Sequence, residues 1–323
     1  MDWDSLENLW NHAFNTLTSS TTQEGLELDQ ILITEPPLNP KSNRHKMIEL
    51  LFEKWNFQQV NVSNQAMLAL HARGLLSGMV VDCGEDVTMV VPVYQGFVPD
   101  NLIRRHGIAG RMVTSHLGRS LRATQGLPFH EGWDSGVGME TVRRIKESTC
   151  FVSTDYTMDQ RLARETTVLT ERYNLPDGTS ILVGQERFEA PEILFHPSLA
   201  GMECRGLSNL VYDTIQEVDV SCRRECYNHI VLSGGSTLFP GLAKRLKNEI
   251  QARYLKEILQ NDESRNNCIS IHVEAPKNRQ YMVFSGASIA GELMKDSDDF
   301  WIDRSDYEEQ GVERALANVR LQM

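Results

Sequence analysis

The sequence predicts an α/β fold, because short apolar runs typical of buried strands alternate with longer segments of helical periodicity. Of the 323 residues, 41% are apolar and 24% are charged, which are globular values and exclude a wholly disordered chain. A chain of this length has room for two domains, or for one large lobed domain with a substantial core.

The charge and the apolar pattern exclude several classes of protein. A formal net charge of −12 argues against a dedicated nucleic-acid binder, which needs a basic stripe for phosphate contacts. No apolar run approaches the length of about 18 residues that a membrane-spanning helix requires. The start, Met1-Asp2-Trp3-Asp4, lacks a basic region and an apolar run, so we expect no secretory signal. Six dispersed cysteines suit a reduced compartment. We therefore expect a cytoplasmic protein without a membrane span.

The first part of the chain alternates helices and strands. Residues 6–14 predict a helix, and residues 31–34 predict a buried strand that Pro36 ends. Residues 45–57 have helical spacing, with five apolar side chains on one face: Met47, Ile48, Leu51, Phe52 and Trp55. Residues 59–62 predict the next strand. Ser63 is the expected N-cap of a helix through Ala72, with Gly74 as its stop.

The middle of the chain predicts a hairpin followed by helices. Residues 79–82 and 87–91 read as strands on either side of an acidic turn at 83–86. Residues 114–121 and 139–147 predict helices joined by a Gly-rich loop at 126–138. Residues 173–179 read as strand, turn and strand.

The last third predicts a buried strand at 229–232 and a helix opened by Pro240. Its expected core face carries Leu242, Leu246 and Ile250, and its expected solvent face carries Lys244, Arg245 and Lys247. A polar loop is expected at 261–267. The acidic segment 296–309 reads as a solvated surface anchored by Phe300, Trp301 and Tyr307, or alternatively as a docking surface for a partner.

Two strand–turn elements are candidate phosphate sites. In residues 81–86 the hairpin turn can aim backbone N–H groups at an anion, and Asp82 at the strand end can hold the water shell of Mg²⁺. In residues 232–241 the paired Gly234 and Gly235 allow a ligand to approach the backbone, and Phe239 can offer its ring to a base. The alternatives are an ordinary acidic turn and a sterically required turn.

Other residues carry weaker signals. Cys222 and Cys226, near His229, have helical spacing but no evident fourth ligand for zinc, so we expect structural cysteines. The isolated histidines show no partner in the sequence and are expected to be surface or satisfied residues: His106, His116 and His196.

Several longer stretches resemble the motifs of the actin superfamily, in the family's order: 32–44, 108–111, 145–147, 175–178, 187–192 and 231–235. The resemblance implies an actin-like fold of two RNase-H-like lobes that binds ATP with Mg²⁺. It begins after the family's first phosphate hairpin and small subdomain, so we expect both to be missing. The implied organisation is a partial subdomain 1 at 1–72 and 282–323, subdomain 3 at 73–108 and 203–281, and subdomain 4 at 109–202.

Three features within the superfamily resemble the actin-related proteins of the complex that nucleates branched actin filaments. They are residues 165–169, residues 254–259 with the polar loop that follows, and the tail residues 294–296, 300–301 and 307–312. The resemblance implies partners in the cytoplasm and cytoskeleton: the actin filament, actin-related protein 3, the other subunits of the branching complex and nucleation-promoting factors. Two alternatives stay open. One is a degenerate actin-like scaffold of another complex, and the other is an active ATPase with the actin fold.

The resemblance also implies site residues. Asp82 would face the metal through water, with Gly84 and Glu85 beside the phosphates. Arg143, Lys146 and Glu147 would line the adenosine site. The phosphate, ribose and base would be held from the opposite side of the cleft by Gly234, Gly235, Ser236, Thr237 and Phe239. Glu49 is the candidate for ordering a water molecule. No catalytic residue is assigned.

The chain departs from the family at four of these positions or their neighbours. Glu85 replaces an aspartate and Asp86 replaces a glycine, which we expect to repel phosphate and to strain the turn. Met89 replaces a histidine near the reacting water, and a thioether cannot relay a proton. Gln280 replaces a lysine near the base. We therefore expect weakened ATP binding and negligible hydrolysis, so that the protein is not an enzyme.

Overall fold

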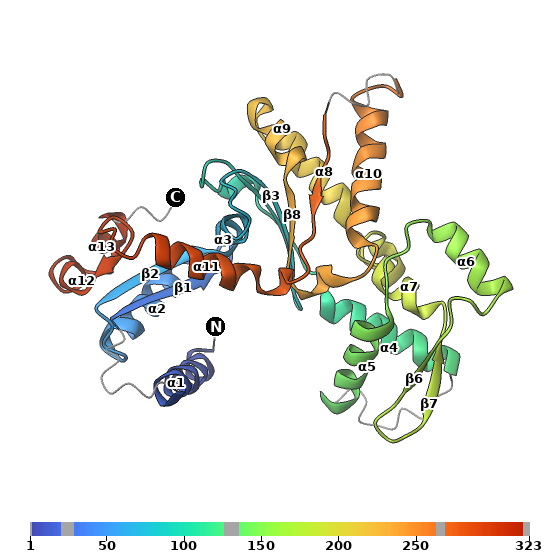
Figure 1. The fold of residues 1–323 in the computed structure, drawn as a ribbon, viewed down its shortest axis with the longest axis horizontal. Helices are drawn as coiled ribbons and strands as arrows, with labels where there is room; N and C mark the ends of the chain where they lie inside the picture. Colours follow the sequence, from blue (N-terminus) through green and yellow to red (C-terminus); the bar gives the residue numbers. More distant parts are fainter. Residues whose placement is uncertain (1, 21–28, 126–135, 263–268, 319–323) are drawn as a thin grey trace. The chain divides into compact units, whose positions relative to one another are not determined.

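A computed structural model describes residues 2–20, 29–125, 136–262 and 269–318. The chain divides into two units, one formed by Met1–Gln65 with Ala287–Met323 and the other by Ala66–Gly286. Both units mix helices and strands (Figure 1), so the predicted α/β class is confirmed. The finer assignment to actin subdomains stays a prediction.

The first unit contains a three-stranded sheet in the order β1-β2-β10. Strands β1 (Gln30–Glu35) and β2 (Gln59–Asn64) are parallel, and β10 (Ile302–Asp303) pairs antiparallel with β2. Its helices are α1 (Trp3–Ser20), α2 (Lys41–Glu53), α12 (Arg304–Gln310) and α13 (Val312–Asn318).

Aromatic and aliphatic side chains form the core of the first unit. The predicted apolar face of α2 is confirmed, since Ile48, Leu51 and Phe52 are fully buried. Trp55 follows the end of α2 and packs against Trp10 of α1, with ring centroids 5.4 Å apart. In the acidic segment, Phe300 and Trp301 are buried, which confirms their role as aromatic anchors.

The predicted N-cap at Ser63 is wrong. Strand β2 continues through Ser63, and helix α3 begins only at Gln65 (Gln65–His71). The Ser63 hydroxyl instead donates to Asn61 Oδ1 at 2.6 Å. The side chains of β2 are buried on both faces, and burial in the sheet outweighs the local capping preference. Gly74 has φ of +68°, as its predicted place after the helix requires.

The second unit is built on a five-stranded sheet in the order β5-β4-β3-β8-β9. Strands β3 (Gly78–Cys83) and β4 (Thr88–Val93) form the predicted antiparallel hairpin. Strand β8 (Ile230–Ser233) is parallel to both β3 and β9 (Val273–Glu274), and β5 (Arg104–His106) pairs antiparallel with β4. The carboxyl ends of β3 and β8 therefore lie side by side, with Asp82 opposite Ser233.

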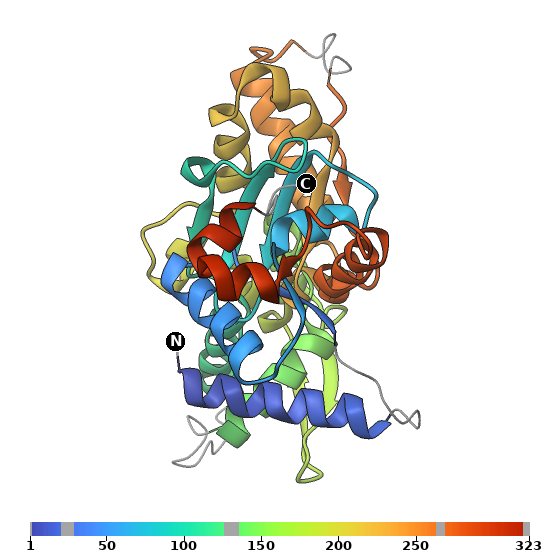
Figure 2. The same ribbon diagram turned by 90° about the vertical axis from the view of Figure 1, so that its left-hand side faces the viewer.

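Helices surround this sheet. Helix α9 (Val220–Asn228) contacts β3, α8 (Leu207–Glu217) contacts β4, and α10 (Leu242–Glu257) contacts β9 (Figures 1 and 2). The predicted strand–turn–strand is the hairpin β6 (Glu171–Asn174) and β7 (Ser180–Val183). The remaining helices are α4 (Gly110–Gln125), α5 (Gly136–Thr149), α6 (Tyr156–Glu165), α7 (Glu186–Glu192) and α11 (Met282–Leu293), which crosses the boundary between the units.

The predicted core face of α10 is confirmed, but Arg245 is not on the solvent face. Leu242, Leu246 and Ile250 are fully buried, and Arg245 is only 7% exposed. Its guanidinium donates to Glu192 Oε1 at 2.9 Å and to the carbonyl of Ser153 at 2.6 Å. A buried arginine is stable only where charged or carbonyl oxygens receive its N–H groups, and this network supplies them.

His196 also has a partner that the sequence did not indicate. Its Nδ1 lies 2.7 Å from the buried Oε1 of Glu192, one helical turn earlier. The structural interpretation of Cys222 and Cys226 is confirmed, since both are buried free thiols. Most of the predicted loops at 126–138 and 261–267 lies outside the described residues. In the described part of the chain, no helix is both long and apolar enough to cross a membrane.

Candidate functional site

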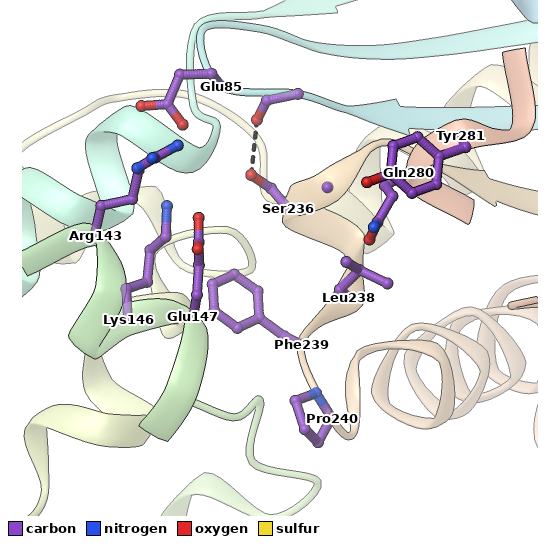
Figure 3. A pocket seen from close by; sticks show the side chains of 12 residues that line it. Glu85, Arg143, Lys146, Glu147, Ser236, Leu238, Phe239, Pro240, Gln280 and Tyr281 are labelled. Atoms are coloured by element: carbon purple, nitrogen blue, oxygen red, sulfur yellow. Dashed lines mark hydrogen bonds between the residues drawn. The ribbon is translucent and has the colours of Figure 1, made fainter. Parts of the chain in front are cut away.

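A cavity of about 470 Å³ opens within the second unit, at the carboxyl ends of β3 and β8 (Figure 3). Crevices at the ends of parallel strands are common ligand sites, because backbone N–H groups and loop side chains converge there. The lining comes from three parts of the unit: Gly84 and Glu85; Arg143, Lys146 and Glu147; and Gly235, Ser236, Leu238, Phe239, Pro240, Gln280 and Tyr281.

The turn between β3 and β4 forms the first wall. Its Gly84 N–H donates to the carbonyl of Val87 at 3.0 Å. The carbonyls of Gly84 and Glu85 accept the N–H groups of Gly110 and Arg111 at 3.0 and 2.7 Å, so the turn caps the start of α4. The expected strain is absent, because Glu85 and Asp86 both keep negative φ and the turn requires no glycine there.

The segment that follows β8 forms the opposite wall. Gly234 has φ of +87°, and a Cβ there would lie 2.3 Å from the carbonyl oxygen of Cys83, so the position requires glycine. Gly235 differs, because a Cβ there would meet no atom within 4 Å. The Ser236 hydroxyl donates to the Gly84 carbonyl at 2.7 Å and joins the two walls (Figure 3).

A buried arginine holds this second wall in place. Arg279 Nε donates to Thr237 Oγ1 at 2.9 Å, and its Nη2 donates to the carbonyl of Thr237 at 2.6 Å. Thr237 is fully buried, and it does not line the cavity. Arg279 is a positioning residue that the sequence did not indicate, because the Thr237 oxygens that accept from it are neutral and lie 42 residues earlier in the chain.

Helix α5 forms the third wall and supplies most of the charged side chains that line the cavity. Lys146 is only 4% exposed, and its Nζ donates to the carbonyl of Gly110 at 3.2 Å. Burial lowers the pKa of Lys146, while the carboxylates of Glu85 and Glu147 raise it. Arg143 is more exposed and makes paired hydrogen bonds of 2.8 and 2.9 Å to Glu140.

Asp82 lies at the end of β3, beside the cavity lining and not in it. Its Oδ1 would be 2.8 Å from a Cβ at Gly234, so the two predicted elements are adjacent, on neighbouring strands. Burial raises the pKa of Asp82, and a hydrogen bond from Ser233 lowers it in part. Among the described residues, no cluster of three or more acidic, His or Cys side chains could hold a metal by itself.

The structure brings together nearly all the predicted nucleotide contacts. The cavity is lined by Gly84, Glu85, Arg143, Lys146, Glu147, Gly235, Ser236 and Phe239, whereas Asp82, Gly234 and Thr237 lie directly beside or behind it. Glu49 belongs to α2 in the first unit, where it lies 3.8 Å from Lys46 Nζ. Its proposed relation to a reacting water stays a prediction.

Sequence reasoning missed Leu238, Pro240 and Tyr281, which also line the cavity. Leu238 is 37% exposed and Tyr281 is 61% exposed, so each offers apolar or aromatic surface to a ligand in the cavity. The one signal in the sequence was proximity, because Leu238 lies between Ser236 and Phe239, and Tyr281 follows Gln280.

Comparison with known proteins decides the family. A family model described as Actin matches residues 1–320. The chain belongs to the actin family. In this actin-family chain the cavity lies where the predicted turn at 81–86, the α5 residues Arg143, Lys146 and Glu147, and the predicted segment 232–241 meet.

The relatives within the actin family include several proteins named actin-related protein 2. The protein of Acanthamoeba castellanii is 45% identical over 314 residues, which is 96% of this chain and 78% of that protein. The protein of Arabidopsis thaliana is 45% identical over 312 residues, with the same two shares. The protein of Drosophila melanogaster is 45% identical over 315 residues, which is 96% of this chain and 76% of that protein. These findings confirm the predicted resemblance to the actin-related proteins and assign it to actin-related protein 2.

Proposed function

We propose that the chain is the actin-related protein 2-like subunit of the complex that nucleates branched actin filaments, in the cytoplasm and its cytoskeleton. The observation that carries this proposal is the 45% identity to proteins named actin-related protein 2, which extends over 96% of the chain. Identity spread over the whole length favours retention of the assembly surfaces, since a fold alone does not specify a function.

The proposed mechanism is templating. The subunit pairs with actin-related protein 3, and the pair presents a surface that resembles two neighbouring subunits of the actin filament. Actin monomers then add to this surface without first forming an unfavourable nucleus of their own. Buried protein–protein area supplies the free energy, and nucleation-promoting factors and the remaining subunits bring the pair together.

The residues of the cavity fit ATP with hydrated Mg²⁺. Open space lies directly against the backbone of Gly235, as the close approach of a ligand requires. Arg143, Lys146 and Glu147 would line the adenosine part of the site, and Leu238 and Phe239 supply apolar surface for a base. Asp82 would hold the water shell of the cation. When bound, the nucleotide adds binding energy that favours one conformation of the subunit.

We propose that hydrolysis is negligible. Met89 is 5% exposed and packs in an apolar cluster that includes Val80 and Val91. No proton can be taken up or released by its thioether at that place. The purified chain incubated with Mg-ATP should release phosphate no faster than a chain-free control. Release at a rate typical of an active ATPase would support the alternative of an actin-fold enzyme.

The assembly itself is tested by affinity purification of the tagged full chain from cells. Recovery of actin-related protein 3 and the other branching-complex subunits is the predicted result. Recovery of the subunits of another assembly, such as a chromatin-remodelling complex, without the branching-complex subunits would contradict the proposal. It would favour the alternative of a degenerate actin-like scaffold.

A further inference from the structure

The cavity wall beyond Ser236 offers mainly apolar and aromatic surface. Leu238 and Phe239 continue this wall, and Figure 3 shows Gln280 and Tyr281 beside Leu238. A flat aromatic ligand covers surface of this kind with its face, while its polar edge needs hydrogen-bonding partners. This part of the wall therefore suits the base of the proposed nucleotide.

The Gln280 side chain is available to that polar edge. Gln280 is exposed, and no described residue forms a hydrogen bond with its amide. Two other polar groups of the lining are less suitable, since Lys146 Nζ already donates to the Gly110 carbonyl and the Glu147 carboxylate can only accept. An amide carries a donor and an acceptor side by side, which is the pattern that the edge of a purine presents.

A side-chain amide can form two parallel hydrogen bonds with either kind of purine. With adenine, its carbonyl accepts from the 6-amino group and its N–H donates to N1. With an oxopurine such as hypoxanthine, the rotated amide donates to O6 and accepts from the N1–H group. The last torsion of glutamine is soft, so the two orientations differ little in energy. The lysine that the resemblance implies at this position only donates, and it lacks this choice.

We infer that Gln280 recognises the edge of the purine base and accepts aminopurines and oxopurines alike. This inference rests on the proposed nucleotide binding and names the ligand class of the cavity: purine nucleotides in general, and not adenine nucleotides alone. A pyrimidine has one ring fewer, so its edge falls short of an amide placed for a purine.

The experiment is calorimetric titration of the full chain with the Mg²⁺ complexes of ADP, inosine diphosphate, cytidine diphosphate and N6,N6-dimethyl-ADP. The test variant is Gln280→Met, which keeps the length of the side chain and removes the amide. The wild-type chain should bind ADP and inosine diphosphate within about threefold of each other. Gln280→Met should weaken the binding of both by about tenfold, because each loses two neutral hydrogen bonds.

The other ligands and a matched variant separate recognition of the base from a general effect on the cavity. Cytidine diphosphate should bind the wild type and Gln280→Met within about twofold, and so should N6,N6-dimethyl-ADP, whose methyl groups block the edge. The matched control is Tyr281→Phe, which removes the neighbouring hydroxyl and keeps the ring. It should change every affinity by under about twofold.

Three results would overturn the inference. Wild-type binding of ADP more than about tenfold tighter than that of inosine diphosphate would show that the cavity distinguishes the two kinds of purine. Unchanged affinities of Gln280→Met for both would show that another group recognises the base. An equal loss for cytidine diphosphate would show that Gln280 shapes the wall and does not bind the base. If none of the nucleotides binds any of the proteins, the nucleotide part of the proposed function fails as well.

Discussion

The position of Asp82 suits cation binding, but the burial of its charge costs stability. A carboxylate at the end of β3 suits the water shell of a cation, but burial raises its pKa because desolvation disfavours the charged form. The folded state then binds the Asp82 proton more tightly than the unfolded chain does. Stability is therefore lost as the pH rises from the ordinary pKa of 3.8 through the raised value.

Asp82→Asn should stabilise the protein by about 1 kcal/mol at neutral pH, because it removes a buried charge and keeps the shape of the side chain. The gain should be larger at pH 7.5 than at pH 4.5, where more of the wild-type carboxyl is protonated. Thermal unfolding of both proteins at the two pH values measures this difference. A gain that shrinks as the pH rises would contradict the assigned direction of the pKa shift.

Gly234 and Gly235 are adjacent in the chain but have different roles. Gly234→Ala should destabilise the fold by about 2–3 kcal/mol, because of its left-handed φ and the contact of a Cβ with the Cys83 carbonyl. Gly235→Ala should leave stability within about 0.5 kcal/mol, yet weaken nucleotide binding by placing a methyl group in the cavity. Denaturant unfolding and ligand titration of the two variants separate these effects. Equal losses of stability would refute the distinction.

At the scale of elements, periodicity predicted the apolar faces of α2 and α10 because burial there follows the helical repeat. It placed Arg245 in solvent, since a charged residue is usually exposed. The partner that permits its burial, Glu192, lies 53 residues earlier in the chain. Tertiary pairing of this kind has no local signal in a sequence.

Arg245→Met should cost about 3–5 kcal/mol of stability, because it leaves the fully buried Glu192 with an uncompensated charge. The cost should be smaller at pH 5 than at pH 8, since burial already raises the pKa of Glu192 and protonation removes its charge. Lys244→Met, one residue away on the exposed face of α10, is the control and should change stability by under about 0.5 kcal/mol. Denaturant unfolding tests all three statements, and an equal cost for both variants would contradict the buried network.

At the scale of the whole molecule, the sequence indicated the family motifs and the turns of the cavity, because glycine pairs and strand ends are local features. It did not indicate that β10 completes the first sheet, with Asn61 Nδ2 donating to the Phe300 carbonyl across 239 residues. A two-residue strand has no periodicity to detect. Leu238 and Tyr281 were missed for a similar reason, since apolar side chains at a ligand site look like core residues in a sequence.

Reconstitution of the branching complex with this chain as its actin-related protein 2 tests the central claim most directly. The chain is combined with the other purified subunits, a nucleation-promoting factor and actin filaments, and polymerisation is followed with fluorescent actin. The account predicts that the complex assembles and accelerates the formation of branched filaments above the level without this chain. Failure of the chain to enter the complex, or assembly without added nucleation, would contradict it.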